Sequence, residues 1–360
     1  MSLLAKLKKN STIKMSSSMA DSKFFNEKDA CVTDLPLLNL ALSGSIHGGL
    51  NSGLTVVAAP SKHFKSNISL FMVAAYLKKF PEAICLFYDS EFGSPPDYLH
   101  SFDIDLDRVL HTPVATVEEL RSDLTVQLDN IERGKDKVVI FIDSIGNLAS
   151  KKETQDALDG KEKADMTRAK TIKSLFRIAT PQFILKDIPC IVINHTIETM
   201  EMFSKTVMTG GTGILYSANT VLFVTKAQEK DGTDLAGFKF TLVAEKSRAV
   251  KERSKFPLIV TFEKGINKYS GMLELASDLD FIRKPKMGWY SRVIDGVQEE
   301  KLWRAKDTNT SEFWNPIFND PAFDDACKAK YRLSSGAKIT EDSIEEEYES
   351  DLDYVDDMDY

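Results

Sequence analysis

The sequence has few cysteines and none of the spacings that give cysteines a structural or redox role. Its 360 residues include four cysteines, Cys31, Cys85, Cys190 and Cys327, and no two of them form a CxxC pair. Cys85 and Cys190 stand inside the apolar runs ICLFYD and PCIVIN. This pattern indicates reduced, buried thiols, and it excludes a disulfide framework and a zinc knuckle.

Long hydrophobic segments are also missing. No apolar run approaches the roughly 20 residues that cross a bilayer. The opening residues, MSLLAKLKKNS, contain no apolar core of a signal peptide. We therefore expect no membrane partner and a location in the cytoplasm.

Positive charge is absent from the last twenty residues. Residues 341–360 hold eleven acidic side chains and no Lys or Arg, whereas the rest of the chain has 46 basic and 43 acidic residues. The net charge of −8 therefore comes from the end of a chain whose remainder is slightly basic. Such a block is typical of a disordered tail. Composition fits equally a tail that aids solubility and one that competes with an anionic partner for a basic groove.

The region from Pro36 to about Phe262 alternates strand-like and helical segments. The expected strands are 54–59, 84–89, 138–143, 189–194, 219–224 and 239–245, and the expected helices are 66–79, 116–133 and 165–187. Near-continuous apolar runs predict strands buried on both faces, hence an α/β fold with a mostly parallel central sheet flanked by helices. Pro181 is expected to end or kink the third helix. In such folds, ligands bind at the carboxyl ends of the strands.

The loop after the first strand has the frame of a phosphate-binding loop without its two glycines. APSKHFKS matches GxxxxGK[ST] at Lys65 and Ser66, whereas Ala59 and Phe64 replace the glycines. The loop leads into a helix N-terminus, where free N–H groups attract phosphate. Lys65 would reach the β- and γ-phosphates of ATP, and Ser66 would hold Mg²⁺. On its own, the pattern fits a plain strand-to-helix turn better than a nucleotide site.

Polar residues end the next three strands in turn. Glu91 follows the second strand, where a carboxylate can orient or deprotonate an attacking water. Asp143 ends the third strand, the position of a Walker-B acid beside Mg²⁺. Asn194 and His195 end the fourth, where a polar group can contact the γ-phosphate. A single histidine there is more often structural. Four polar groups at successive strand ends nevertheless favour a site for ATP and Mg²⁺.

Further stretches extend through most of the chain: SKFFNEKD (22–29), LFYDSEFG (86–93), FIDSIGNLASKKET (141–154), TRAKTIKSLFRIATP (167–181), INHTIETMEMFSKTVM (193–208) and EKSRAVKERSKF (245–256). Together they resemble the UvsX family, the RecA-type strand-exchange recombinases of T-even-type bacteriophages. In that family a phenylalanine already stands at the position of Phe64, whereas Ala59 is a departure. The resemblance implies an N-terminal polymerisation arm (1–30), a RecA-like P-loop ATPase core (31–269), a small C-terminal domain (270–335) and a disordered acidic tail (336–360).

The resemblance also implies roles for single residues. Glu91 matches the catalytic carboxylate, and His195 stands where RecA-like proteins have a glutamine that senses the γ-phosphate. Lys246 and Arg248 match a basic pair that reaches the γ-phosphate of the neighbouring subunit, although their spacing alone fits a solvated strand end. The implied catalytic residues are Glu91, Lys65, Lys246, Arg248 and His195. The implied nucleotide-binding residues are Pro60, Ser61, Lys62, His63, Phe64, Lys65, Ser66, Asn67, Tyr98 and Asp143, with Ser66 and Asp143 as Mg²⁺ ligands. Tyr98 would stack on adenine, and the alternative is an aromatic residue on a helix surface.

Two connections, 149–165 and 196–213, are unusually polar for segments between buried strands. Long connections of this kind are usually functional or disordered. The second combines Met and Phe with Lys and Gly, which suits insertion between bases and backbone contacts to phosphate. The resemblance places the two DNA-binding loops here. The expected DNA contacts are Lys151, Lys152, Arg168, Met202, Phe203, Lys205, Gly210 and Gly211.

The sequence thus predicts a DNA-dependent ATPase that forms helical filaments on single-stranded DNA and catalyses homologous pairing and strand exchange in recombination, recombination-dependent replication and repair. The implied partners are single- and double-stranded DNA, further copies of the chain, a phage single-strand-binding protein and a recombination mediator, in the cytoplasm of the infected bacterium. Two alternatives stay open. One is a RecA-fold hexameric helicase or motor. The other is a hydrolysis-deficient mediator, which only the altered phosphate loop favours and Glu91 argues against.

Overall fold

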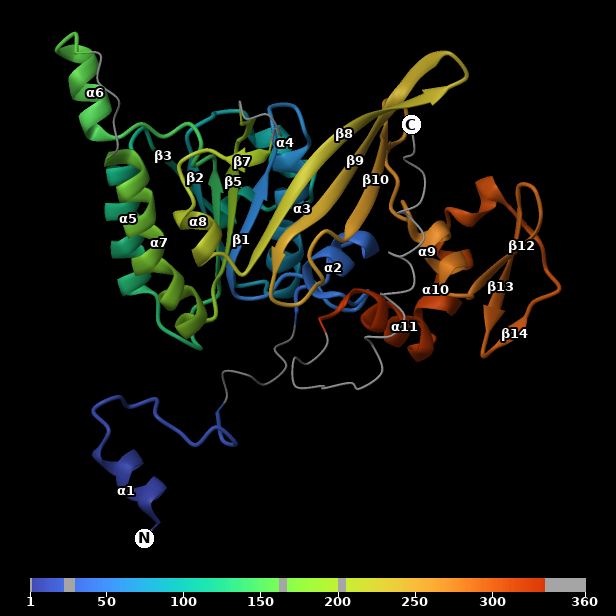
Figure 1. Cartoon of the computed structure of the whole chain (residues 1–360), viewed down its shortest axis with the longest axis horizontal. Coiled ribbons are helices and arrows are strands. Elements are labelled where there is room, and N and C mark those ends of the chain that lie inside the picture. The colour runs from blue at the N-terminus through green and yellow to red at the C-terminus, as the bar shows by residue number, and fades with distance from the viewer. Residues whose placement is uncertain (1, 23–29, 162–166, 200–204, 334–360) are drawn as a thin grey trace, which may run out of the picture.

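A nine-stranded sheet forms the centre of the molecule (Figure 1). The structure is a computed structural model that describes residues 2–22, 30–161, 167–199 and 205–333. The strand order is β11-β10-β9-β8-β1-β5-β4-β2-β3. These strands are β1 (Gly53–Ala58), β2 (Ile84–Asp89), β3 (Val109–Pro113), β4 (Val138–Asp143), β5 (Pro189–Asn194), β8 (Thr220–Asp231), β9 (Asp234–Ser247), β10 (Lys255–Thr261) and β11 (Gly265–Ile266). Neighbours from β3 to β8 pair in parallel, and β8 to β11 pair antiparallel. The predicted α/β fold with a mostly parallel sheet is confirmed.

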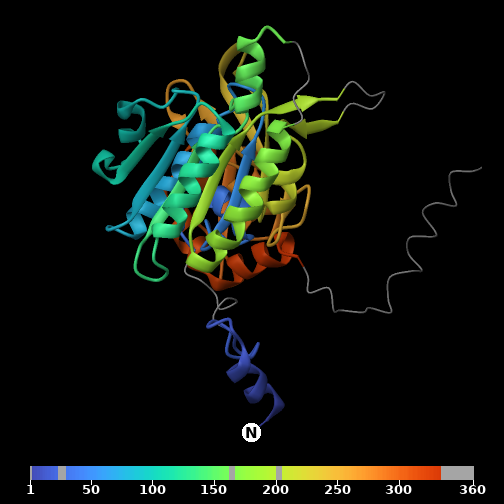
Figure 2. The ribbon, with the colours of Figure 1, turned by 90° about the vertical axis from the view of Figure 1, so that its left-hand side faces the viewer.

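Helices cover both faces of this sheet (Figure 2). Every residue of β1, β4 and β5 is buried, which explains their unbroken apolar runs. Because successive strand residues point to opposite faces, Val56 and Val57 belong to two different buried clusters. One cluster contains residues of α5 (Val117–Asn130), α7 (Thr167–Lys186) and α8 (Gly213–Ser217), and the other those of α2 (Pro36–Ser43) and α3 (Lys65–Lys79).

The helix α7 continues through Pro181 to Lys186, so of the two expected effects of this proline, ending or kinking the helix, the first does not occur, and the helix predicted over 165–187 is present. A proline inside a helix removes one backbone hydrogen bond. Ala179 and Phe183, on either side of it, are both buried in the core beneath α7. Their packing holds the two halves of the helix on the sheet in spite of the missing bond.

Several strands are longer than predicted or were not predicted. The segments 219–224 and 239–245 are parts of the long β8–β9 hairpin, whose described outer residues, 225–230 and 232–236, are exposed or half-buried. β3 is an edge strand with mostly exposed residues, and β10 and β11 extend the other edge. These segments lack the continuous apolar run that a strand buried on both faces requires.

The C-terminal part packs onto the main core. It comprises α9 (Met272–Asp278), β12 (Ile282–Lys286), β13 (Trp289–Ile294), β14 (Val297–Gln298), β15 (Trp303–Arg304), η2 (Ala305–Thr308), α10 (Ser311–Phe318) and α11 (Pro321–Tyr331). Trp314 and Phe323 belong to the same buried cluster as Leu35 and Phe256. Asp324 of α11 accepts hydrogen bonds from Ser45 Oγ at 2.7 Å and from the Ile46 N–H at 2.9 Å. The C-terminal part is therefore anchored to the segment that follows α2.

The remaining elements lie outside the sheet. They are α1 (Leu3–Asn10), α4 (Pro96–His100), η1 (Leu106–Arg108), α6 (Lys151–Leu158), β6 (Thr196–Glu198) and β7 (Thr206–Met208). Every residue of α1 is exposed. The division into 1–30, 31–269, 270–335 and 336–360 stays a prediction, and its acidic tail lies outside the described residues. Among the residues that are described, no helix has both the length and the apolar character needed to cross a membrane.

Candidate functional site

The polar residues predicted to form a nucleotide site converge at one end of the sheet. Lys65 begins α3 directly after the loop that follows β1, Glu91 follows β2, Asp143 ends β4 and His195 follows β5. These four strands are neighbours in the parallel part of the sheet, so their carboxyl ends meet at the same edge.

The loop between β1 and α3 adopts a tight conformation with two non-glycine residues at positive φ. Lys62 has φ 60° and Phe64 has φ 64°. Lys65 is buried, and its Nζ donates to the Pro60 carbonyl at 2.9 Å. Burial lowers the pKa of Lys65, although the charges of Glu91 and Asp143 act in the opposite direction. Pro60, Ser61 and Lys62 are exposed, and His63 Nδ1 bonds the Ser61 carbonyl at 2.8 Å. The first turn of α3 continues with Ser66 and Asn67, both partly exposed.

Ser66 and Asp143 form a pair suited to hold Mg²⁺. Ser66 Oγ donates to Asp143 Oδ2 at 2.8 Å. The other oxygen, Asp143 Oδ1, is buried without a hydrogen-bond partner among the described residues. Burial raises the pKa of Asp143 to about 6. A buried carboxylate oxygen with an unused lone pair beside a serine hydroxyl is the ligand set that Mg²⁺ takes from a phosphate-binding loop and a Walker-B acid.

Glu91 is held by the two segments that follow β4 and β5. His195 Nε2 bonds Glu91 Oε1 at 2.8 Å, and Ser144 Oγ donates to the same oxygen at 2.6 Å. The hydrogen bond from His195, followed by that from Ser144 and the charge of Lys65, lowers the pKa of Glu91 against the effect of burial. The side chains of Glu91 and His195 keep 30% and 23% of their surface exposed, so a ligand can reach them.

His195 is coupled through the backbone to the segment after it. Asn194 Oδ1 accepts from the His195 N–H at 2.9 Å and from Thr209 Oγ1 at 3.0 Å. The Thr209 N–H donates to the His195 carbonyl at 2.9 Å. A Cβ on Gly146 would approach His195 Cδ2 to 2.4 Å, so this glycine leaves the room that the imidazole fills. Glu91, His195 and Thr209 therefore form one connected unit.

The two predicted DNA-binding loops contain regular structure that was not predicted. The first, 149–165, includes the helix α6, which begins at a capping box of Ser150 and Glu153. The second, 196–213, forms the antiparallel β6–β7 hairpin. Both follow parallel strands, and both project from the site's end of the sheet (Figure 2). The sequence predicted both segments as irregular connections because neither has the apolar periodicity of a buried element.

The predicted DNA contacts differ in their placement. Lys151, Lys152 and Lys205 are exposed, and Gly210 and Gly211 have φ 82° and 85° at the end of the hairpin. Met202 and Phe203 lie outside the described residues.

Arg168 is hydrogen-bonded inside the molecule. Its guanidinium donates to the carbonyls of Ile145, Gly146 and Leu148 at 2.6–3.1 Å. These carbonyls belong to the irregular segment after β4, which needs donors from elsewhere. Arg168 therefore braces this segment, and its contact with DNA stays a prediction.

Three further predicted residues, Tyr98, Lys246 and Arg248, have their own contacts outside this cluster. Tyr98 of α4 packs edge-on against Phe102, and burial, followed by the charge of Asp143, raises its pKa to about 12. Lys246 Nζ donates to the carbonyls of Leu215 and Tyr216, and Arg248 is exposed beside the beginning of β8, where its N–H donates to the Asn219 carbonyl. Since β1 and β8 run in parallel, Arg248 is at the end of the sheet opposite to the phosphate loop.

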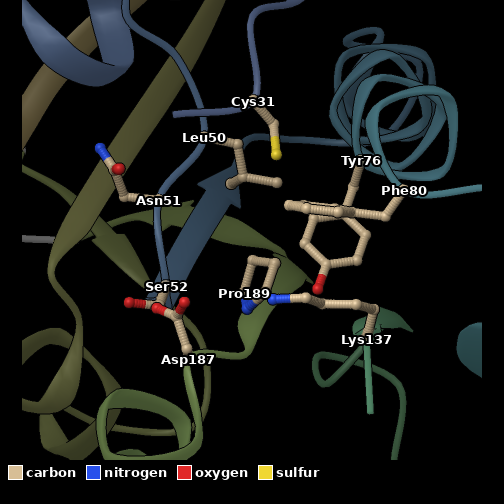
Figure 3. A pocket seen from close by; sticks show the side chains of 9 residues that line it. All are labelled: Cys31, Leu50, Asn51, Ser52, Tyr76, Phe80, Lys137, Asp187 and Pro189. Atoms are coloured by element: carbon tan, nitrogen blue, oxygen red, sulfur yellow. The ribbon is translucent and has the colours of Figure 1, made fainter. Parts of the chain in front are cut away.

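A cavity of about 230 Å³ lies away from this site (Figure 3). Its lining includes residues at the amino ends of β1 and β5, whereas the polar cluster stands at the carboxyl ends. The lining residues are Cys31, Leu50, Asn51, Ser52, Tyr76, Phe80, Lys137, Asp187 and Pro189.

Sequence reasoning missed three residues that contact the site. Ser144 bonds Glu91, and its position directly after Asp143 is a signal that was open to use. Phe240 and Lys226 contact the phosphate loop from β9 and β8. No local pattern indicates these two contacts, because they join segments more than 160 residues apart.

The chain is similar to known recombination proteins. Residues 269–327 match a protein family described as "Bacteriophage T4, Recombination and repair protein, C-terminal domain". The chain is 56% identical over 352 residues to the recombination and repair protein of Enterobacteria phage T4, an alignment that covers 96% of this chain and 90% of that protein. It is 23% identical to Protein RecA of Mycolicibacterium vanbaalenii, over 89% of this chain and 88% of the relative. It is also 23% identical to Protein RecA of Mycobacteroides abscessus, over 87% of each.

Proposed function

The chain belongs to the family of the phage T4 recombination and repair protein, the UvsX branch of the RecA recombinases, and we propose that it is a DNA-dependent ATPase which exchanges DNA strands. In this proposal it assembles into helical filaments on single-stranded DNA and pairs that strand with a homologous duplex. A phage single-strand-binding protein and a recombination mediator would act with it in the cytoplasm of the infected cell.

The phosphate loop and the strand ends support ATP as the substrate. The N–H groups at the start of α3 and the ammonium of Lys65 face the end of the sheet where phosphates would lie. Mg²⁺, held by Ser66 and Asp143, would neutralise charge on the β- and γ-phosphates. The pKa of Glu91 is lowered from an ordinary value of 4.5, so Glu91 is ionised at neutral pH and is a weaker base than a free carboxylate. A weakly basic carboxylate is a poor proton acceptor, so we assign Glu91 the orientation of the attacking water.

The observation that carries the proposal is the contact between Glu91 and His195. The 2.8 Å hydrogen bond joins Glu91 to His195, the residue directly before β6. Asn194, on the other side of His195, is hydrogen-bonded to Thr209, the residue directly after β7. Any group that competes for Glu91 or His195 would thereby shift the β6–β7 hairpin. ATP binding and DNA binding would then favour each other, because coupling between two sites is reciprocal.

Lys246 and Arg248 support hydrolysis at a subunit interface. Arg248 lies at the end of the sheet opposite to Lys65, so it cannot act on a phosphate bound in its own subunit. Lys246 pairs with Val221 at the beginning of β8, two residues before Arg248, and burial, followed by the charge of Arg248, lowers the pKa of Lys246. In a head-to-tail filament this pair would approach the phosphate loop of the next copy, in the manner of an arginine finger.

The test is ATP hydrolysis at fixed salt, with and without single-stranded DNA, beside Lys65→Ala. We expect strong stimulation by DNA that Lys65→Ala abolishes. Hydrolysis that is indifferent to DNA would indicate another RecA-fold motor, which electron microscopy would reveal as closed rings in place of open filaments. A wild-type protein without hydrolysis would indicate a mediator.

The proposed coupling has its own measurement. DNA affinity is compared with a non-hydrolysable ATP analogue, with ADP and without nucleotide, all at one salt concentration. Equal affinity in the three states would contradict the coupling through His195 and leave the ATPase assignment intact.

A further inference from the structure

The phosphate loop holds two residues in a backbone conformation that usually requires glycine. Lys62 and Phe64 have φ 60° and 64°. In this left-handed region the Cβ of an ordinary residue lies too close to the following carbonyl oxygen, and the conformation persists only when the surroundings enforce it. Phe64 stands at the second glycine position of the phosphate-loop pattern. The loop therefore needs an external constraint that a glycine-rich loop does not need.

One side of that constraint is an aromatic stack. The ring of Phe64 lies on the ring of Phe240, with centroids 4.9 Å apart and planes inclined by 13°. Phe240 is 4% exposed and sits in β9, in register with Lys226 of β8. It is thus a fixed surface in the middle of the long hairpin. The Phe64 carbonyl accepts the Ile68 N–H at 3.1 Å, so the orientation of Phe64 also sets the first turn of α3.

The other side is a lysine from the same hairpin. Lys226 Nζ donates to the Lys62 carbonyl at 3.4 Å and lies 3.7 Å from the centre of the Phe238 ring. The ring face attracts the ammonium group and limits its movement. Both strained residues of the loop are therefore contacted by the β8–β9 hairpin, one through its side chain and one through its carbonyl.

We propose that the β8–β9 hairpin holds the phosphate loop in its ATP-binding conformation, with Phe240 and Lys226 as positioning residues. This inference rests on the proposed ATPase function. Neither residue contacts the phosphates in this assignment. They act by keeping Phe64 and Lys62 at positive φ, so that the loop is already shaped for phosphate before ATP arrives.

The test is a double-mutant cycle on ATP binding, measured as KM in DNA-dependent hydrolysis and as Kd for a fluorescent ATP analogue. Phe240→Leu should raise KM about three- to tenfold, the range that loss of an aromatic pair produces, with a much smaller change in kcat. Phe64→Gly removes the need for the stack. In that background Phe240→Leu should change KM less than about twofold, because the two residues act through one interaction.

Two further variants separate positioning from folding. Lys226→Met removes no buried core side chain and should raise KM about two- to threefold on its own. Phe262→Leu is the matched control, because Phe262 packs edge-on against Phe238 but is 65% exposed and does not contact the loop. It should leave KM unchanged.

The outcomes distinguish this inference from the proposed function. A wild-type protein that binds no ATP would overturn both. ATP binding by the wild type that Phe240→Leu and Lys226→Met leave unaltered would overturn the inference alone. The inference would also be overturned if Phe240→Leu raised KM equally in the wild-type and in the Phe64→Gly background, since Phe240 would then act through another route.

Discussion

At the scale of single residues, Asp143 combines a cost in stability with the role in Mg²⁺ binding that we propose for it. Its folded pKa of about 6 exceeds the ordinary value of 3.8, so the folded protein favours the protonated carboxyl. Ionisation of Asp143 therefore lowers the free energy of unfolding at pH values above about 6, and this cost fades as the pH falls through 6. Mg²⁺ requires the ionised form. The ionised form that would bind Mg²⁺ is therefore also the form that lowers the free energy of unfolding, and such a conflict between function and stability is common at functional sites.

Asp143→Asn should therefore stabilise the nucleotide-free protein while abolishing Mg²⁺-dependent hydrolysis. At pH 8 we expect a gain of roughly 1–3 kcal/mol in the free energy of unfolding, and a much smaller gain at about pH 4.5. Urea unfolding at the two pH values measures this, with Asp129→Asn on the exposed side of α5 as control. A loss of stability at pH 8 would contradict the assigned cost. In the wild type, Mg²⁺-dependent ATP binding should weaken as the pH falls through 6.

Gly146 controls the position of His195 by leaving space for it. Gly146→Ala would place a Cβ 2.4 Å from His195 Cδ2, a separation that forces the imidazole away from Glu91. We expect the stimulation of hydrolysis by DNA to fall about tenfold or more, in line with the loss of a positioned catalytic contact. ATP binding should persist, because Lys65 and Ser66 are untouched.

The control for Gly146→Ala is Gly93→Ala. A Cβ on Gly93 would meet no atom of the described residues within 4 Å, and the φ of Gly93 is not positive. Its hydrolysis should match that of the wild type. Equal loss of stimulation in both variants would show that the effect does not pass through His195.

At the scale of elements, burial decides which segments the sequence reveals. β1, β4 and β5 were predicted almost to the residue because they are buried on both faces and read as unbroken apolar runs. β3 has exposed residues such as Leu110 and was not predicted. The β6–β7 hairpin and α6 were expected as loops because most of their described side chains are exposed. Propensity alone is too weak a signal for such short elements.

In the candidate site, too, the sequence reveals only part of what the structure contains. Lys65, Glu91, Asp143 and His195 were predicted together because parallel strands bring their carboxyl ends to one edge. The contacts of Arg168 with three carbonyls and of Phe240 with Phe64 depend on tertiary packing. Neither contact leaves a signal in the local sequence, so neither was predicted.

Pro181 provides a prediction at this scale. It is exposed inside α7, towards the end of the helix, where its ring removes one helical hydrogen bond. Pro181→Ala should raise the free energy of unfolding by about 1–3 kcal/mol, because the helix geometry is already present and a donor is restored. Urea unfolding measures the change. Unchanged or lower stability would indicate that α7 needs the proline, for example to shape its packing between Ala179 and Phe183.

At the scale of the whole molecule, a buried carboxylate helps to anchor the C-terminal part to the main core. Asp324 is 5% exposed and binds Ser45, the Ile46 N–H and Lys328, the last at 2.8 Å. Its removal leaves a buried hydroxyl and N–H without their acceptor. Asp324→Ala should therefore cost about 2–4 kcal/mol of the free energy of unfolding. Asp325→Ala is the control, because its side chain is 72% exposed and it binds the same lysine.

The same anchor predicts how the molecule unfolds. The three tryptophans, Trp289, Trp303 and Trp314, all lie in the C-terminal part, so their fluorescence reports that part, whereas far-UV circular dichroism reports chiefly the helices on the main sheet. Trp314 shares a buried cluster with Leu35 and Phe256, so the C-terminal part has no separate core of its own to melt. The two urea transitions should coincide in the wild type and shift together in Asp324→Ala. An earlier fluorescence transition would instead show that the small C-terminal domain predicted over residues 270–335 unfolds independently of the main core.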